Sequence, residues 1–128
     1  MTETVNLNPP CMIQISRKSQ KKSEDKFDVV ILEAIEESLG SFRAFDKQEV
    51  YFHLKNTYNI SKREIPRKIE EFAFAMEKIF GIGSRLIEIR IIEAIHKKIP
   101  EFVFTSKTNA VIFEEYVTSL RAFLLHSP

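Results

Sequence analysis

Glu88 and His53 are the residues of this sequence that could form an acid–base pair. At about 100° per residue along a helix, Glu88 falls in the same arc as the isoleucines at positions 87, 91, 95 and 99. A carboxylate facing a core has to be paired or has to take up a proton. His53 or Tyr51 could hydrogen-bond it, and a proton-sensing pair is the functional interpretation. We favour the structural interpretation, a buried polar pair that fixes helix packing.

The remaining residues form no catalytic or metal-binding pattern. The histidines, at positions 53, 96 and 126, lack the spacing of metal ligands, and no serine has the G-x-S-x-G setting of a nucleophile elbow. Cys11 is the only cysteine, so one chain cannot build a disulfide or a thiolate metal cluster. The turn before Ser84 and Arg85 follows a helix and lacks the glycine pattern of a phosphate-binding loop. The sequence therefore predicts a protein that is not an enzyme and holds no cofactor or metal.

Four cations near the middle of the chain are candidates for nucleic-acid contact: Lys62, Arg63, Arg67 and Lys68. They fall at the start of the second helix of a helix-turn-helix-like segment, residues 46–72, where phosphate and base contacts usually arise. Pro66 lies inside that first turn, and glutamates at positions 64, 70 and 71 interrupt the positive charge. A solvated basic helix end is the simpler interpretation, so DNA binding is the second hypothesis.

Two aromatic residues fall on the polar side of their predicted helices. Phe74 projects nearly opposite the apolar stripe of its helix, and Phe52 points toward Gln48 and Lys55. An exposed aromatic with charged neighbours is a reasonable anchor for a protein interface. Cover by a neighbouring helix is the alternative for both. Phe52 and Phe74 are therefore candidate interface residues.

Capping residues and apolar spacing predict the elements that position these side chains. Residue types that begin helices stand at four places: Ser23, Asp46, Ser61 and Ser84. Residue types that end them follow each one: Gly40, Asn59, Gly81 and Pro100. A last helix is predicted from about residue 109 to Leu125. The sequence therefore predicts an all-α fold, a compact bundle of about five helices.

The most regular apolar spacing lies in the third of these helices. Its members are spaced four, three, four and three apart: Ile65, Ile69, Phe72, Met76 and Ile79. Strand periodicity cannot generate that set, whereas one face of a helix does.

Composition supports the same fold class. Hydrophobic residues make up 44% of the chain, which argues against disorder throughout, and three glycines and five prolines are too few for a turn-rich β-sandwich. Nineteen basic residues nearly balance eighteen acidic ones, so a protein that coats nucleic acid through overall charge is not expected. There is no apolar stretch of about 18 residues and no secretory signal, so we expect a cytoplasmic protein without membrane contact.

Residues 1–23 are predicted to form a flexible basic arm in front of a single domain, residues 24–128. The arm carries the run Arg17-Lys18-Ser19-Gln20-Lys21-Lys22, typical of a solvated tail. Contact of this run with nucleic acid or an acidic partner is the sharper alternative. The last helix, within residues 108–126, adds a long apolar stripe to the domain, which predicts a homodimer.

Several short pieces between residues 27 and 99 resemble a known family. They are Ile31-Leu32-Glu33-Ala34-Ile35, Tyr51-Phe52-His53-Leu54, Ile65-Pro66, Glu71-Phe72, Ile79-Phe80-Gly81 and Leu86-Ile87-Glu88. In this order they resemble the archaeal Nitrosopumilus-type output domain family, formerly a domain of unknown function. The resemblance implies an archaeal source and a helical domain that acts as a signalling output or adaptor. It supplies no catalytic residues, and the arm and last helix lie outside it.

The function predicted from these observations is a non-enzymatic helical interaction module that acts through protein–protein contact. The alternative is a DNA-binding transcriptional regulator that uses residues 46–72 and the basic arm.

Overall fold

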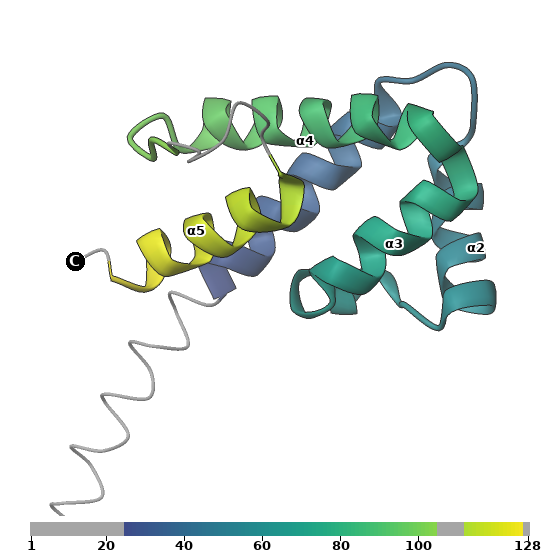
Figure 1. Cartoon of the computed structure of the whole chain (residues 1–128), viewed down its shortest axis with the longest axis horizontal. Coiled ribbons are helices and arrows are strands. Elements are labelled where there is room, and N and C mark those ends of the chain that lie inside the picture. Colours follow the sequence, from purple (N-terminus) through teal and green to yellow (C-terminus); the bar gives the residue numbers. More distant parts are fainter. Residues whose placement is uncertain (1–24, 105–111, 127–128) are drawn as a thin grey trace, which may run out of the picture.

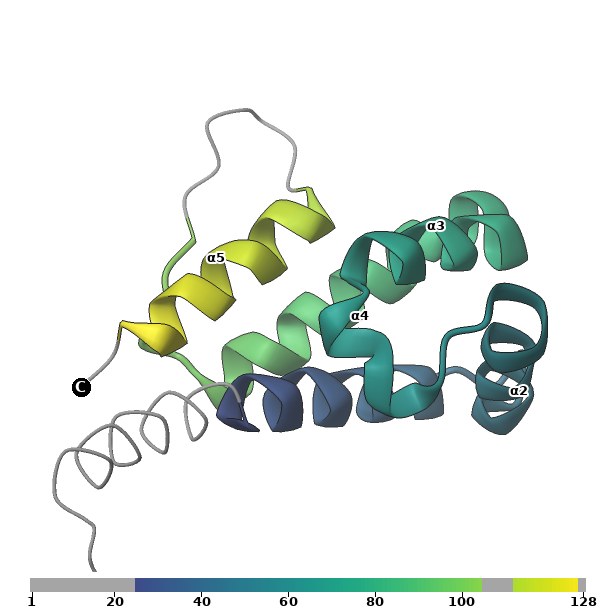
Figure 2. The ribbon, with the colours of Figure 1, turned by 90° about the horizontal axis from the view of Figure 1, so that it is seen from below.

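The computed structural model describes residues 25–104 and 112–126, and the regular elements in these ranges are all helices. The N-terminal helix, residues 25–40, extends along the length of the domain (Figures 1 and 2). Helix α2 lies near its C-terminal end and α5 near its N-terminal end, and α3 and α4 complete the bundle. The predicted all-α bundle is therefore confirmed. The predicted arm, with Cys11 and Ser23, lies outside the described residues.

Helix α2 (Lys47–Tyr58) begins and ends at the residues that the sequence predicts. An Asp46 carboxylate oxygen accepts a hydrogen bond from the Gln48 backbone N–H at 3.0 Å, which satisfies one of the free donors of the first turn. Asn59 ends the helix with a φ of 57°, and its N–H donates to the Leu54 carbonyl. A short polar side chain tolerates this left-handed conformation better than most. Local chemistry therefore sets both ends.

The segment predicted as one helix from Ser61 to Gly81 is divided in two. The capping box is present, with the Ser61 N–H donating to the Glu64 carboxylate at 3.0 Å. It opens a 3-10 helix, η1 (Lys62–Arg67), and α3 (Ile69–Phe80) begins only after Lys68, whose φ of −131° is not helical. Pro66 explains the division, because it has no N–H for a continuous ladder and disfavours α conformation in the preceding residue. Gly81, with a φ of 60°, ends α3 as predicted.

Two more helices close the bundle. The short helix η2 (Gly81–Gly83) leads into α4 (Ser84–Lys98), and α5 is Phe113–Leu125. The prediction that Ser84 caps α4 is wrong, because Gly83 holds the capping position and no side chain caps this end. Ser84 is instead the buried first residue of α4. Residues 102–104 are not helical, and the expected start of the last helix near residue 109 lies outside the described residues.

One apolar core joins all the helices. The regular stripe of η1 and α3 faces it, with Ile65, Phe72 and Met76 no more than 1% exposed. The stripe of α5 faces it too, and five of its members are buried: Phe113, Tyr116, Val117, Leu120 and Leu124. The surface on which the predicted homodimer was based is therefore covered within a single chain.

Candidate interaction surfaces

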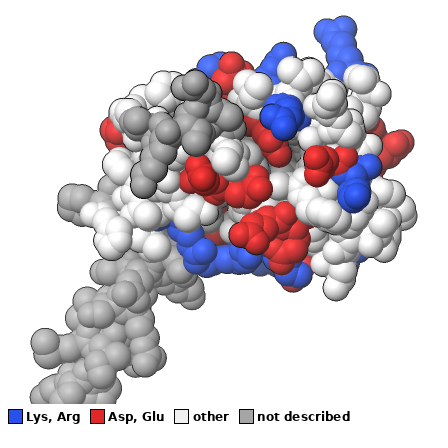
Figure 3. Space-filling model, in the orientation of Figure 1, with Lys and Arg blue, Asp and Glu red and all other residues white. Residues whose placement is uncertain are grey.

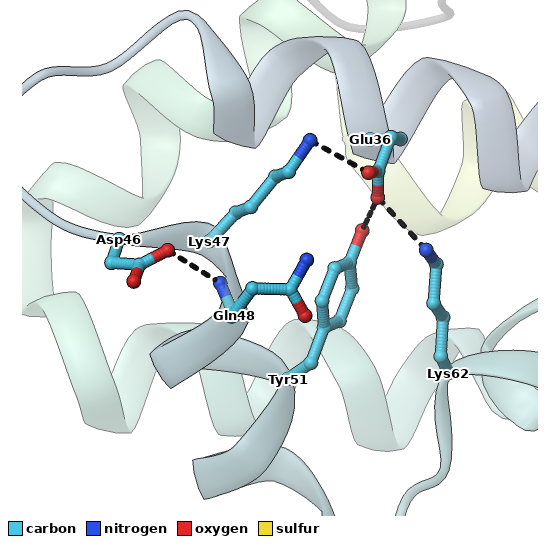
Figure 4. A network of polar contacts seen from close by, with 6 residues as sticks. All are labelled: Glu36, Asp46, Lys47, Gln48, Tyr51 and Lys62. Atoms are coloured by element: carbon cyan, nitrogen blue, oxygen red, sulfur yellow. Dashed lines mark hydrogen bonds and ion pairs between the residues drawn. The ribbon is translucent and has the colours of Figure 1, made fainter.

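Glu36 connects three elements that are far apart in the sequence (Figure 4). Its carboxylate lies 2.7 Å from the Lys47 Nζ and 2.9 Å from the Lys62 Nζ, and it accepts a hydrogen bond from the Tyr51 hydroxyl at 2.8 Å. These donors belong to α2 and η1, whereas Glu36 belongs to the N-terminal helix. The two lysines, followed by the tyrosine, lower the pKa of Glu36 from 4.5 to about 2. The network therefore has a structural role: it holds α2 and η1 against the N-terminal helix.

Three of the four candidate nucleic-acid contacts form ion pairs within the chain. Lys62 meets Glu36 and also lies 4.7 Å above the Tyr51 ring. Arg67 is 3.1 Å from an Asp28 oxygen, and Lys68 is 3.6 Å from Glu64. Arg63 is exposed on η1. Lys62, Arg63 and Arg67 belong to the short 3-10 helix η1, and Lys68 directly follows it. They do not lie on the first turn of a continuous recognition helix, so this segment does not have the geometry of a helix-turn-helix.

The predicted buried pair of Glu88 and His53 is wrong. His53 lies exposed on α2, with its Nδ1 3.4 Å from the Thr57 hydroxyl and its ring against Tyr58. Glu88 is half-buried on α4, where burial raises its pKa and the charges of Glu114 and Glu77 add to the effect. The helical arc was correct, since Ile87, Ile91 and Ile95 are buried, but Glu88 lies at the edge of that arc.

Both candidate interface aromatics are exposed. The exposed fraction is 70% for Phe52 and 56% for Phe74. The Lys78 ammonium lies 5.2 Å from the centre of the Phe74 ring on the same helix. The expectation that these two rings face outward therefore agrees with the structure.

A second set of exposed apolar residues, which we call the α4 stripe, was not predicted. It consists of Ile82, Leu86 and Ile89, which are 89%, 62% and 53% exposed. Their spacing of four and three places them on one side of η2 and α4, opposite the buried face. Ile87, Ile91 and Ile95 also follow a helical spacing, four and four. The sequence pattern could therefore have shown two apolar faces but not which one is covered.

The α4 stripe lies between two arginines of α4. Arg85 and Arg90 are both exposed and lie on opposite flanks of the stripe at about 100° per residue. The Arg90 guanidinium lies 5.3 Å from the Phe42 ring and donates a hydrogen bond to the Ser41 hydroxyl at 3.3 Å. Between residues 82 and 90 the surface is therefore apolar along its centre, with an arginine on each flank.

A cleft of about 400 Å³ lies where α3, α4 and the start of α5 meet. Four glutamates line it: Glu70, Glu77, Glu88 and Glu114. Figure 3 shows carboxylates gathered on this face of the molecule. Arg85 is the only cation among its lining residues in the described chain, and Phe74 and Ile112 supply exposed apolar surface. We call this feature the acidic cleft.

A second hollow of about 290 Å³ adjoins the acidic cleft, because the two share Glu70 and Glu114. It is also lined by Phe27, near the beginning of the described N-terminal helix. Arg67 and Arg121 contribute positive charge here, so this end of the groove is less acidic than the cleft.

Neither surface carries the groups of a metal site. Within residues 25–104 and 112–126, no group of three or more histidine, cysteine, aspartate or glutamate side chains is placed to hold a metal ion. A search of the same ranges finds no helix with the length and apolarity needed to cross a membrane. Comparison with family models, curated proteins and solved structures gave no significant match to this chain.

Proposed function

We propose that this protein is a non-enzymatic helical interaction module that acts through contact with another protein. The observation that carries the proposal is the α4 stripe, three aliphatic side chains of η2 and α4 that are between 53% and 89% exposed. Exposed aliphatic residues that are aligned at helical spacing gain the free energy of burial only when a partner covers them, about 1.5–3 kcal/mol for each side chain.

The charges beside the stripe define the partner that fits it. Arg85 and Arg90 flank Leu86 and Ile89, so a partner with apolar side chains and acidic neighbours would be complementary. Two copies of α4 packed antiparallel about a twofold axis would set each flank against its own equivalent, with arginine toward arginine. A different protein therefore suits this surface better than a second copy. The α5 stripe, on which the predicted homodimer was based, packs in the core.

Regulation is the context that the family resemblance supplies. Leu86, which belongs to one of the resembling pieces, is also a member of the α4 stripe. A signalling output or adaptor domain needs a surface for the next component and needs no reaction chemistry. DNA binding is the weaker proposal, because Lys62, Arg67 and Lys68 are engaged by carboxylates.

A photo-crosslinking amino acid at Leu86 tests the proposal in the cells that make this protein. We expect a discrete crosslinked product, whose partner is then purified and titrated against the unmodified domain. The double variant Leu86→Ser and Ile89→Ser should weaken that binding by tenfold or more, because burial of the two side chains together contributes at least about 1.4 kcal/mol.

The matched control is Val103→Ser, which removes a residue that is 78% exposed outside the stripe. Equal weakening by the control, or a partner whose affinity ignores the double variant, would remove the α4 stripe from the proposal. Titration with duplex DNA at two salt concentrations tests the alternative, since phosphate contacts must give a steep salt dependence.

A further inference from the structure

The acidic cleft differs from the α4 stripe in what it can bind. Its four glutamates face one arginine, and no ion pair joins Glu70, Glu77 or Glu114 to any other described residue. Like charges on the walls of one hollow repel each other, and a cation placed between them relieves that repulsion. The cleft also has exposed apolar surface, since Phe74 and Ile112 are 56% and 42% exposed. The cleft therefore fits a segment with several cations and an apolar neighbour.

This chain contains such a segment. Residues 17–22 carry four cations, Arg17, Lys18, Lys21 and Lys22, without an acidic residue between them. The apolar residues Ile13 and Ile15 precede this run. No other six-residue stretch of the sequence combines four cations with no carboxylate. The run is thus positively charged where the cleft is negatively charged, and its four cations equal the four glutamates of the cleft in number.

The run is attached to the domain beside the second hollow, which adjoins the acidic cleft. Phe27 lines the hollow that adjoins the cleft, and the run ends three residues before Asp25. Eight residues separate Arg17 from Asp25, and at about 3.3 Å per residue they span up to about 26 Å. Along α3, the distance from Glu70 to Glu77 is only about 10 Å at 1.5 Å per residue. The tether is therefore longer than the stretch of α3 that lines the cleft.

The charges along this path favour the cleft over the nearer hollow. Among the described lining residues, the hollow presents Arg67 and Arg121 beside its glutamates, whereas the cleft presents Arg85. We propose that the acidic cleft is the docking site of this chain's own basic segment, residues 17–22, which covers Phe74 when it is bound. This inference concerns a different surface from the α4 stripe and stands without the proposed function.

Paramagnetic labelling of the full-length chain tests the inference. In the variant Cys11→Ser/Ser19→Cys, the only thiol lies inside the basic run and no cation is lost. A nitroxide at this thiol should broaden the amide signals of cleft residues such as Phe74, Glu77 and Arg85. The broadening should be lost at about 1 M salt, where the Debye length falls from about 10 Å to about 3 Å.

Two matched variants separate docking from the mere proximity of a tethered tail. Glu77→Gln with Glu114→Gln should remove the broadening, whereas Glu93→Gln with Glu101→Gln, which alters exposed glutamates outside the cleft, should not. The amide spectrum itself reports whether each variant is folded. Broadening that is spread evenly over the surface, or that ignores both salt and the cleft variant, would overturn the inference.

A mixed sample distinguishes the chain's own segment from that of a second copy. It combines an isotope-labelled chain without a nitroxide and an unlabelled chain that carries one. Broadening of the cleft signals in this mixture at the level of the single-chain sample would assign the run to a second copy and overturn docking within one chain. We expect the mixture to show none.

Discussion

The carboxylates of the N-terminal helix and those of the acidic cleft have the same chemistry and opposite surroundings. Asp28, Glu33, Glu36 and Glu37 each meet a cation from another element, and Lys98 alone contacts both Glu33 and Glu37. Among the described residues that line the cleft, four glutamates face one arginine. The pKa of Glu36 is lowered to about 2, whereas that of Glu88 is raised. A carboxylate that is paired with a cation stabilises the fold, and one that lies among other carboxylates is available for a cationic ligand.

The largest expected effect is a loss of stability when the packing of α5, whose first residues line the acidic cleft, is weakened. Leu120 is fully buried on α5, so Leu120→Ala should lower the free energy of unfolding by about 2–5 kcal/mol through lost burial and a cavity. Urea unfolding measures this change. Leu125→Ala, at a residue that is 37% exposed, is the control and should cost clearly less. Equal costs would mean that α5 is not fixed by its buried face.

An intermediate effect on stability should come from the ion-paired carboxylates of the N-terminal helix. For Glu36 the folded pKa is about 2 and the unfolded value is 4.5, so its stabilisation is complete above about pH 5 and is lost as pH falls toward 2. About a third of the side chain is exposed, so solvent screening limits the gain to about 1–2 kcal/mol. Glu36→Gln should therefore lower stability at pH 7 and flatten the acid limb.

The control for this variant is Glu33→Gln, because the Glu33 side chain is 58% exposed and lies 3.5 Å from Lys98. It should change the free energy of unfolding by about 0.5 kcal/mol or less. If both variants have the same effect at pH 7 and at pH 3, the network in Figure 4 contributes no specific stability.

The smallest effect on stability, with the opposite sign, should come from the carboxylates of the acidic cleft. The folded pKa of Glu88 lies above 4.5, so the folded state holds this proton more tightly and stability falls as pH rises from 4.5 through the folded pKa. Glu88→Gln removes that loss and should leave stability at pH 7 unchanged or raise it by about 0.5 kcal/mol or less. A clear destabilisation at pH 7 would show that the Glu88 carboxylate has a cation partner.

Helix limits were predictable where one residue and its neighbours determine them. Asp46 caps α2, and Asn59 and Gly81 end α2 and α3, because a hydrogen bond or a positive φ acts within a few residues. The division at Lys68 was not predicted, although Pro66 was noted in the first turn. Counted from the Ser61 cap, Pro66 lies beyond the first turn, at a position where a continuous α-helix would need its N–H to bond the Lys62 carbonyl.

The surfaces were harder to predict because exposure depends on which element packs over which. Phe74 was identified since charged residues surround it on one helix, and it is exposed. Ile89 and Ile91 look alike in the sequence, yet one is 53% exposed and the other is fully buried. The environment of Glu88 comes from α3 and α5, whose relation to α4 is not encoded within α4 itself.

The contacts of the N-terminal helix also have a consequence for the order of events during synthesis. Residues 25–40 leave the ribosome before any of the cations that meet them, and the last of these, Lys98, follows about sixty residues after Glu37. Until Lys98 emerges, Glu33 and Glu37 lack the cation that meets them in the folded domain, whereas Glu36 can already meet Lys47 and Lys62. Completion of these ion pairs is therefore tied to late translation, and a chain that stops before residue 98 would leave Glu33 and Glu37 without Lys98.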